Sequence, residues 1–403
     1  MMALSRSSQQ VPRRVQARCL SDESRAGQLD QPLILATLAL LSIGTVMVAS
    51  TSISAAETYS VGTWHFLIRH LVFISLGLGL ALACQFLDTR LLENSGRICL
   101  LLSLMLLVAV LIPGLGVTVN GATRWLNFGL FRFQVVEAVK LLMIVYVASY
   151  LARHPDLGRS GLVDTIKPLL VAGLIAVVLL KQPDMGSAVV IVAILGGMVW
   201  LAGAAWKYLG LLGLGAAPLI ASAALVPYRR ERLAILGDPF ADPFDTGFQL
   251  VQALIAVGRG QLGGVGLGDS VQKLFYLPEA HTDFIFAILA EELGLFGIVA
   301  VLALFAIVVF RIFRIGVHAH RSERRFAAFA VYGVGLWIGL QALISIGVNL
   351  GVLPTKGLTL PFVSAGGSSM MMLLLAVGLV IRVGWELNQA KLAKPRRRRE
   401  WLP

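Results

Sequence analysis

Long apolar runs with few charged residues recur along the whole chain, and they constrain its fold more than any other feature. A helix needs about 20 apolar residues to cross a hydrocarbon core roughly 30 Å thick. The segment "KQPD" at 181–184 separates two of the runs, because a proline and two charges are costly inside one span. The sequence therefore predicts an all-α integral membrane protein with ten transmembrane helices, at residues 32–50, 66–87, 98–112, 133–152, 166–180, 185–202, 208–226, 283–312, 326–350 and 362–383.

Composition and charge agree with this class. Hydrophobic residues make up 57% of the 403 residues and charged residues 14%, which excludes a soluble globular domain. With the N-terminus inside, most of the 34 Lys and Arg residues fall on the inside, so the positive-inside rule places both termini in the cytoplasm. We expect a cytoplasmic tail at 1–31, the membrane domain at 32–385 and a basic cytoplasmic tail at 386–403. The terminal "KPRRRRE" favours an anchor beside anionic lipid over a nucleic-acid site.

The largest segment outside the predicted spans is the loop at 227–282, which this topology makes extracytoplasmic, between the seventh and eighth helices. An outward basic cluster suggests an anionic partner. The glycine-rich stretch 258–268 would let backbone amides approach a phosphate, although a plain flexible or re-entrant loop is an equal alternative. Five cations lie in this loop, against the topology rule: Arg229, Arg230, Arg232, Arg259 and Lys273.

Ionisable residues cluster where the eighth span begins, in "YLPEAHTDFIFAILAEELG" at 276–294. A helix cap explains Asp283 alone. Glu279 and His281 lie beside it, and Glu291 and Glu292 lie inside the apolar helix, where carboxylates are costly unless they face a polar cavity. We expect Glu291 to face a wet cavity below Asp283 and Glu292 to point toward a neighbouring helix.

Three further segments offer partners for this cavity. In the first, Arg124 and Arg132 precede Glu137 and Lys140, which stand at i, i+3 spacing in the fourth span. That pair is either a self-contained ion pair or part of the cavity, and the sequence leaves both open. In the second, "KQPDMGS" sets Asp184 at a helix start, where capping is the default. The third, "GVLPTKGLTLPFVSAGGSS" at 351–369, holds Lys356 and Ser364 in an outer hairpin.

Taken together and in order, "QPDMGS", "GLGDSVQKLFYLPEAHTDFIFAILAEELG" and "PTKGLTLPFVSAGGSS" resemble the SEDS (shape, elongation, division, sporulation) proteins of bacteria. The resemblance covers about residues 30–385, and "PTKGLTLP" is similar to the division-type rather than the elongation-type members. Two departures stand out. The family's Gln-Pro-Ser-Glu is Gln-Val-Val-Glu at 134–137 here, and its Ser-Tyr-Gly-Gly is Ser-Ala-Gly-Gly at 364–367.

The resemblance implies a peptidoglycan glycosyltransferase that polymerises lipid II, with undecaprenyl pyrophosphate as leaving group. It makes Asp283 the essential carboxylate, as general base or as a metal-assisting group. A divalent cation, Mg²⁺ or Mn²⁺, would bind at Asp283 if anywhere, and no organic cofactor is expected. The substrate-binding residues expected around it are Arg124, Glu137, Lys140, Arg259, Lys273, Glu279, His281, Glu291, Lys356 and Ser364.

The same resemblance implies partners and a location. A class B penicillin-binding protein transpeptidase and other division proteins are expected as partners, in the bacterial inner membrane at the septum, without nucleic acid. Two alternatives remain from the residues themselves. A lipid II flippase would also need wet helices, although the chain shows no repeated halves. A noncatalytic division scaffold would leave Asp283 without a role.

Overall fold

The computed structural model is largely helical, and it describes residues 29–58, 62–119, 121–129, 131–155, 162–208, 210, 213, 235–245, 247–274, 276–355 and 357–399. Its helices lie close to the predicted spans. Their bounds are α2 (Gln31–Thr58), α3 (His65–Cys84), α4 (Thr89–Asn94), α5 (Gly96–Leu111), α6 (Val135–Arg153), α7 (Leu162–Lys181), α8 (Met185–Leu201), α11 (Phe248–Arg259), α12 (Ile285–Arg321), α13 (Arg325–Asn349) and α14 (Gly367–Arg399).

Six of the described helices are long and apolar enough to cross a membrane, namely α2, α3, α6, α12, α13 and α14. Helices α5 and α8 are apolar but shorter. Of the ten predicted spans, nine coincide with a described helix. The seventh, at 208–226, falls almost wholly outside the described residues, so the total of ten stays a prediction.

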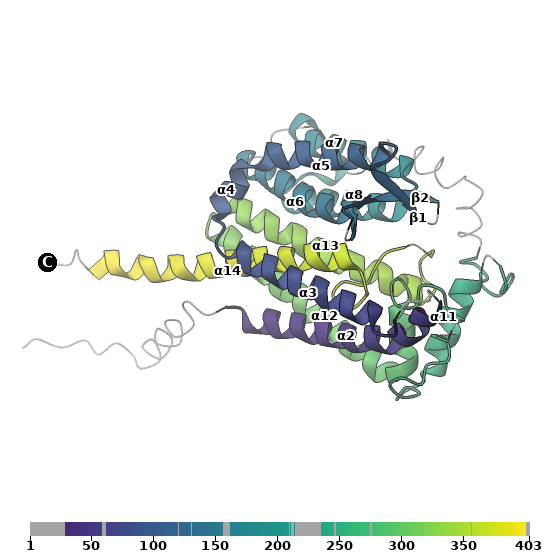
Figure 1. The fold of residues 1–403 in the computed structure, drawn as a ribbon. Helices are drawn as coiled ribbons and strands as arrows, with labels where there is room; N and C mark the ends of the chain where they lie inside the picture. The colour runs from purple at the N-terminus through teal and green to yellow at the C-terminus, as the bar shows by residue number, and fades with distance from the viewer. Residues whose placement is uncertain are drawn as a thin grey trace, which may run out of the picture.

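Figure 1 shows the helices running side by side along one direction. Helices α2, α3, α12, α13 and α14 form one part of the bundle, while α5, α6, α7 and α8 form the other. The start of α2 and the end of α14 lie at the same end, and the strands and α11 lie at the opposite end (Figure 1). Helix α14 continues to Arg399, so the predicted tail at 386–403 begins inside a helix rather than at its end.

A small antiparallel sheet corrects the all-α prediction. Strands β1 (Gly116–Val119), β2 (Ala122–Asn127) and β3 (Arg132–Gln134) pair in the order β1-β2-β3. Gly121, in the β1–β2 turn, has a φ of +74°, which glycine adopts without strain. Outside the hydrocarbon core, backbone groups of an extended segment can be satisfied by neighbouring strands. The fourth predicted span, expected from residue 133, therefore begins as a helix only at Val135.

Helix α12 is interrupted at Gly294, where φ is +63° and ψ is −158°. The glycine-rich loop packs against this break through its backbone. The amides of Val265 and Gly266 donate to the carbonyls of Glu291 and Glu292 at 2.9 and 3.2 Å. In return, the amides of 295 and 296 donate to the carbonyls of 261 and 262 at 3.0 and 3.3 Å. At least two amides of the loop are thus engaged by the helix and are not available to a phosphate.

The break changes the depth of the two glutamates. The part of α12 from 295 to Arg321 is about 40 Å long at 1.5 Å per residue, enough to span a bilayer by itself. Helix α2 gives a second measure. Asp30 pairs with Arg311 at 2.6 Å, and Ser50, about 30 Å or one hydrocarbon thickness farther along α2, bonds Glu292 at 2.6 Å. Glu292 and its neighbour Glu291 therefore lie near the edge of the apolar slab that is remote from Asp30, rather than deep within the slab.

We expect Gly264→Ala to destabilise the protein by about 2 kcal/mol or more, because its φ is +79° and an added Cβ would overlap the carbonyl of Glu292. Thermal unfolding of the detergent-solubilised protein measures this. Gly263→Ala is the matched control, since a Cβ there meets nothing within 4 Å. Equal midpoints for the two variants would contradict the role given to the loop.

Candidate active site

Segments distant in the sequence converge on Asp283. A Cβ built on Gly357 would lie 3.3 Å from Oδ2 of Asp283 and 4.0 Å from Nη1 of Arg124. Arg124 belongs to β2, and Gly357 to the hairpin between α13 and α14. The Nε of Arg124 lies 3.8 Å from Oδ2 of Asp184, which precedes α8. Four of the segments that the sequence singles out therefore meet at one place.

The backbone of Asp283 is held by Asn349 of α13. The amide nitrogen Nδ2 of Asn349 donates to the carbonyl of Asp283 at 3.0 Å, and Oδ1 accepts from the amide of Ala287 at 3.0 Å. The first turn of α12 is thus capped from a neighbouring helix, and its own N-cap, Phe284, makes no side-chain capping bond. The carboxylate of Asp283 is therefore not needed to explain why α12 starts here.

The hairpin also holds the two residues before Asp283. The hydroxyl of Ser364 donates to the carbonyl of Thr282 at 2.7 Å, and the amide of Ala365 donates to the carbonyl of His281 at 3.0 Å. Thr282 in turn donates to Oε2 of Glu279 at 2.8 Å. Of the residues predicted to bind substrate, Ser364 and Glu279 therefore bond to the His-Thr-Asp segment itself.

His281 is buried beside Phe66, with ring centroids 4.8 Å apart. Burial lowers the pKa of His281 below its usual value of 6.5, which outweighs the opposing effect of Glu279. The imidazole is therefore neutral at pH 7, and it contributes packing and hydrogen bonding next to Asp283 rather than charge.

Several cations are predicted to bind substrate. Of those that the structure describes, only Arg124 lies near Asp283. Two acceptors in the segment before α8 orient its guanidinium. Nη2 donates to the carbonyl of Pro183, and Nε faces the carboxylate of Asp184. Asp184 also caps α8 through a 3.1 Å bond from the amide of Ser187, as the sequence predicts. Lys356 lies outside the described residues, although its neighbour Gly357 is at the site.

Glu137 and Lys140 form a buried ion pair in α6. The Nζ of Lys140 lies 2.9 Å from Oε1 of Glu137 and 2.7 Å from Oε1 of Gln341, and it faces the ring of Trp337 at 5.0 Å. These contacts occupy the ammonium group. Oε2 of Glu137 is buried without a hydrogen-bond partner among the described residues. The geometry favours the structural ion pair over direct contact of Lys140 with substrate.

Gln341 is a residue that sequence reasoning missed. Its Oε1 accepts from Lys140 and from Nε1 of Trp337, both at 2.7 Å, while its Nε2 donates to the carbonyl of Thr359 at 3.0 Å. It therefore connects α6 to the hairpin that reaches Asp283. The sequence carries a sign of this role. Gln341 and Asn349 are polar residues in an apolar helix, and their spacing of eight residues places them on one face of α13.

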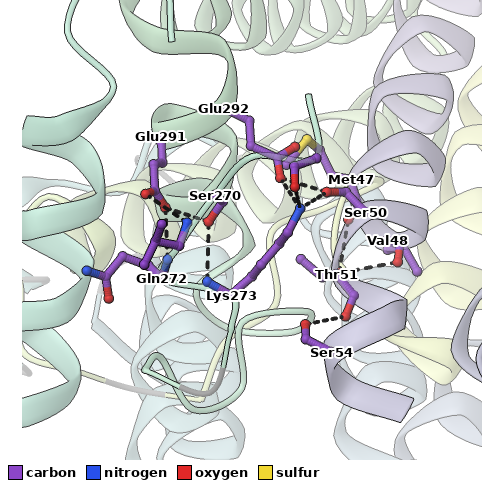
Figure 2. Close-up of polar contacts among 12 residues, drawn as sticks. Met47, Val48, Ser50, Thr51, Ser54, Ser270, Gln272, Lys273, Glu291 and Glu292 are labelled. Carbon is purple, nitrogen blue, oxygen red and sulfur yellow. Dashed lines mark hydrogen bonds and ion pairs between the residues drawn. The ribbon is translucent and has the colours of Figure 1, made fainter. Parts of the chain in front are cut away.

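The remaining loop cations lie elsewhere. Figure 2 shows Lys273 reaching Glu292 and Ser50, with distances of 2.7 and 2.8 Å from its Nζ. Arg259, 45% exposed at its side chain, lies 3.3 Å from Glu291. These two cations neutralise the glutamates at the break in α12 instead of lining the space at Asp283. Arg229, Arg230 and Arg232 lie outside the described residues.

The sequence predicts that Glu291 faces a wet cavity below Asp283, and the structure places its side chain elsewhere. Its carboxylate accepts from the hydroxyl of Ser270 and from the amides of Val271 and Gln272 at 3.2 and 3.4 Å (Figure 2). The break in α12 allows the loop to fold over this side chain. Glu292 does point toward a neighbouring helix, because Ser50 belongs to α2.

Comparison with known proteins agrees with the geometry. The model of the cell cycle protein family that comprises FtsW, RodA and SpoVE matches residues 31–389. The chain belongs to the SEDS family, and it is of the FtsW type.

Relatives of the same type span nearly the whole chain. The probable peptidoglycan glycosyltransferases FtsW of Thioalkalivibrio sulfidiphilus and Coxiella burnetii are 50% and 46% identical, each over 89% of this chain and over 90% and 96% of their own lengths. A solved structure on "Structural coordination of polymerization and crosslinking by a peptidoglycan synthase complex" matches with a TM-score of 0.72 and 31% identity, covering 89% of this chain and 98% of its own. The Thermus thermophilus rod shape determining protein RodA matches with a TM-score of 0.65 and 29% identity, covering 88% and 96%.

The two departures from the usual SEDS sequence are accommodated locally. Val135 and Val136 are buried at the start of α6, which follows β3 directly and needs no proline to begin. The amide of Gln134 there donates to Ser368 at 3.1 Å. Ala365 contributes its backbone amide to the carbonyl of His281, a bond that any residue but proline can make.

We expect Lys140→Met and Glu137→Gln each to destabilise the protein more than the double variant does. Removing Lys140 alone leaves a buried carboxylate unpaired, at a cost of roughly 3–5 kcal/mol. Thermal midpoints of the two single variants and the double variant in detergent test this. Equal midpoints across the set would exclude the structural pair.

We expect Gln341→Met to lower the rate of glycan polymerisation by about 10–100-fold, because it releases the hairpin beside Asp283. Gln341→Glu keeps acceptors for Lys140 and Trp337 but loses the donor to Thr359, so its rate should fall as well. The control is Gln85→Met, which removes a similar bond of 2.9 Å to Gly378 in another part of the bundle. A loss of rate no greater than the control's, or one that merely follows the thermal midpoint, would count against this positioning role.

Proposed function

We propose that this chain polymerises lipid II into glycan strands, with Asp283 as the general base. The observation that carries the proposal is the approach of Oδ2 of Asp283 and Nη1 of Arg124 to the same glycine, Gly357. Peptidoglycan glycosyltransferase is the activity named for relatives 46–50% identical over about nine-tenths of the chain. The activity accounts for both groups, since glycosyl transfer needs a base and a partner for an anionic leaving group.

The proposed reaction uses each group once. The hydroxyl oxygen of the acceptor sugar attacks the anomeric carbon of the donor, while Asp283 takes the hydroxyl proton. A carbon–oxygen bond forms between the sugars as the bond to the pyrophosphate oxygen breaks. Undecaprenyl pyrophosphate leaves with the bonding electrons, and the guanidinium of Arg124 stabilises the charge that develops on it.

The contacts of the two residues suit these roles. Asn349 holds the backbone of Asp283, and the hairpin holds the backbone of Thr282 before it. These bonds fix the position from which the carboxylate of Asp283 extends. Arg124 is anchored on its Asp184 side, so its Nη1 is directed toward Gly357 without reorganisation during the reaction. The site lies near the end of the bundle that holds the strands, where a lipid-linked sugar can reach it (Figure 1).

We propose that any divalent cation at this site is bound together with the substrate. The described residues hold no cluster of three His, Cys, Asp or Glu side chains suited to a metal ion. Asp283 has a guanidinium nearby instead. Mg²⁺ or Mn²⁺ at Asp283 would therefore take further oxygen ligands from the pyrophosphate, where it would neutralise charge.

We further place the protein at the division septum with the Asp283 end facing outward and both termini in the cytoplasm. The distribution of Lys and Arg supports this orientation. A class B penicillin-binding protein is the proposed partner, along with other division proteins. A similar structure comes from a peptidoglycan synthase complex that coordinates polymerisation with crosslinking. The match to the cell cycle protein family and the FtsW relatives support the septal location.

Asp283→Asn should abolish polymerisation of lipid II, with a loss of at least about 100-fold, since the amide cannot accept the proton. The fold should survive because Asn349 bonds the backbone of residue 283 and not its side chain. Gel analysis of the glycan made by the purified variant measures the activity, and its thermal midpoint measures the fold. Asp269→Asn in the outer loop is the matched control and should polymerise normally.

Three outcomes would redirect the proposal. Polymerisation by Asp283→Asn at the wild-type rate would remove Asp283 as the base. Transfer of labelled lipid II between leaflets by wild-type protein that makes no glycan would favour the flippase alternative. An inactive wild-type chain in both assays would favour a noncatalytic scaffold.

A further inference from the structure

A cavity lined by charged side chains lies at the end of the bundle away from the strands. Its volume is about 770 Å³, and it is lined by α4, by the turn between α12 and α13, and by the end of α14. Four guanidinium groups and four carboxylates line it: Arg90, Arg324, Arg325, Arg382, Asp88, Glu93, Glu323 and Glu386. Their formal charges cancel. A purely anionic or purely cationic ligand would therefore meet as much repulsion as attraction.

Three of these eight charged groups are already engaged in one partly buried cluster around Glu386. Its Oε1 lies 2.9 Å from Nε of Arg382, and its Oε2 lies 3.1 Å from Nη1 of Arg324 and 2.7 Å from the hydroxyl of Thr89. Arg382 also stacks on Trp385 at 4.7 Å. This cluster ties α4, α13 and α14 together and forms a rigid wall of the cavity.

Four of the remaining five charged groups are open to a ligand, whereas the carboxylate of Asp88 caps α4 by accepting from the amide of Arg90 at 2.9 Å. Arg90 and Arg325 are exposed, and no side-chain ion pair or hydrogen bond engages either guanidinium within the described part of the chain. The same holds for the carboxylates of Glu93 and Glu323. The cavity therefore presents two free cations and two free anions beside a fixed wall. Such a lining suits a ligand that carries both signs of charge close together.

Exposed apolar side chains next to the cavity indicate how deep it lies in the membrane. Phe86 is 90% exposed and Leu91 63% exposed, on the segment that leads into α4 and along it. Exposed apolar side chains beside charged ones are typical of the boundary between headgroups and acyl chains. The molecule that is concentrated at this boundary is a phospholipid, and basic pockets between helices at this level are known to hold headgroups.

We propose that this cavity binds the zwitterionic headgroup of a phospholipid that carries a primary ammonium. Arg90 and Arg325 take the phosphate, and Glu93 and Glu323 take the ammonium. Guanidinium groups match phosphate oxygens in geometry, and an ammonium can donate hydrogen bonds to carboxylates where a quaternary amine cannot. Phosphatidylethanolamine has this chemistry, whereas phosphatidylcholine lacks the N–H donors and phosphatidylglycerol lacks the cation. The proposal is independent of the reaction at Asp283.

The test uses the full chain in nanodiscs with equal amounts of the three lipids, followed by native mass spectrometry of the lipids that remain bound. Wild type should retain phosphatidylethanolamine about fivefold over the other two. The double variant Arg90→Gln/Arg325→Gln should lose about that factor of bound phosphatidylethanolamine. The double variant Glu93→Gln/Glu323→Gln should lose the discrimination between phosphatidylethanolamine and phosphatidylcholine while still retaining both.

The matched control is Arg97→Gln/Arg314→Gln, which removes two exposed arginines of the same charge outside the cavity lining. It should retain lipids as wild type does. Equal retention of all three lipids by wild type, or the same loss in the cavity variant and the control, would overturn the proposal. A preference for phosphatidylglycerol would overturn it too, because it would show attraction of anionic lipid by general positive charge. All four exchanged cavity residues are at least partly exposed, and thermal midpoints verify that the variants fold.

Discussion

Backbone hydrogen bonding between the glycine-rich loop and the broken helix α12 is the constraint on which the half of the bundle beside α11 depends. A helix interrupted beside lipid leaves amides and carbonyls without partners, and these are costly in a medium that offers no water. Here the loop supplies partners on both sides of Gly294. The close approach of the two backbones requires glycine at Gly260 and Gly264, where a Cβ would overlap the carbonyls of Ala290 and Glu292. Lys273 and Arg259 then neutralise the two buried glutamates that precede the break.

The polar face of α13 gives the active site its rigidity. Gln341 and Asn349 lie on one face of this helix, and each bonds to a different element near Asp283. One holds the hairpin through Thr359, and the other holds the backbone of Asp283 and the first turn of α12. Both amides are buried, so their bonds are shielded from water and cannot be exchanged cheaply. The backbone that carries the proposed base, Asp283, is thereby fixed from the side.

The sequence predicts the location of some site residues and not of others, and one physical reason accounts for the difference. Asp283 and Arg124 were both singled out, and the structure brings them together. Lys273 was assigned to the same cavity by its charge alone, yet it pairs with Glu292 at the break in α12. Charge and helical spacing predict what a side chain can do and which face it occupies. They do not predict where a loop of more than 50 residues folds back, which decides its partner.

The sequence by itself determined the membrane class, nine helix positions within the described residues, the family and the carboxylate at the start of α12. Those properties follow from local information, because apolar run length and motif identity need no knowledge of distant contacts. Only the tertiary structure decided the sheet before α6, the depth of Glu291 and Glu292, and the capping of α12 by Asn349. Each of these depends on which backbone groups from remote segments satisfy one another, and that is a property of the packed chain rather than of any stretch of it.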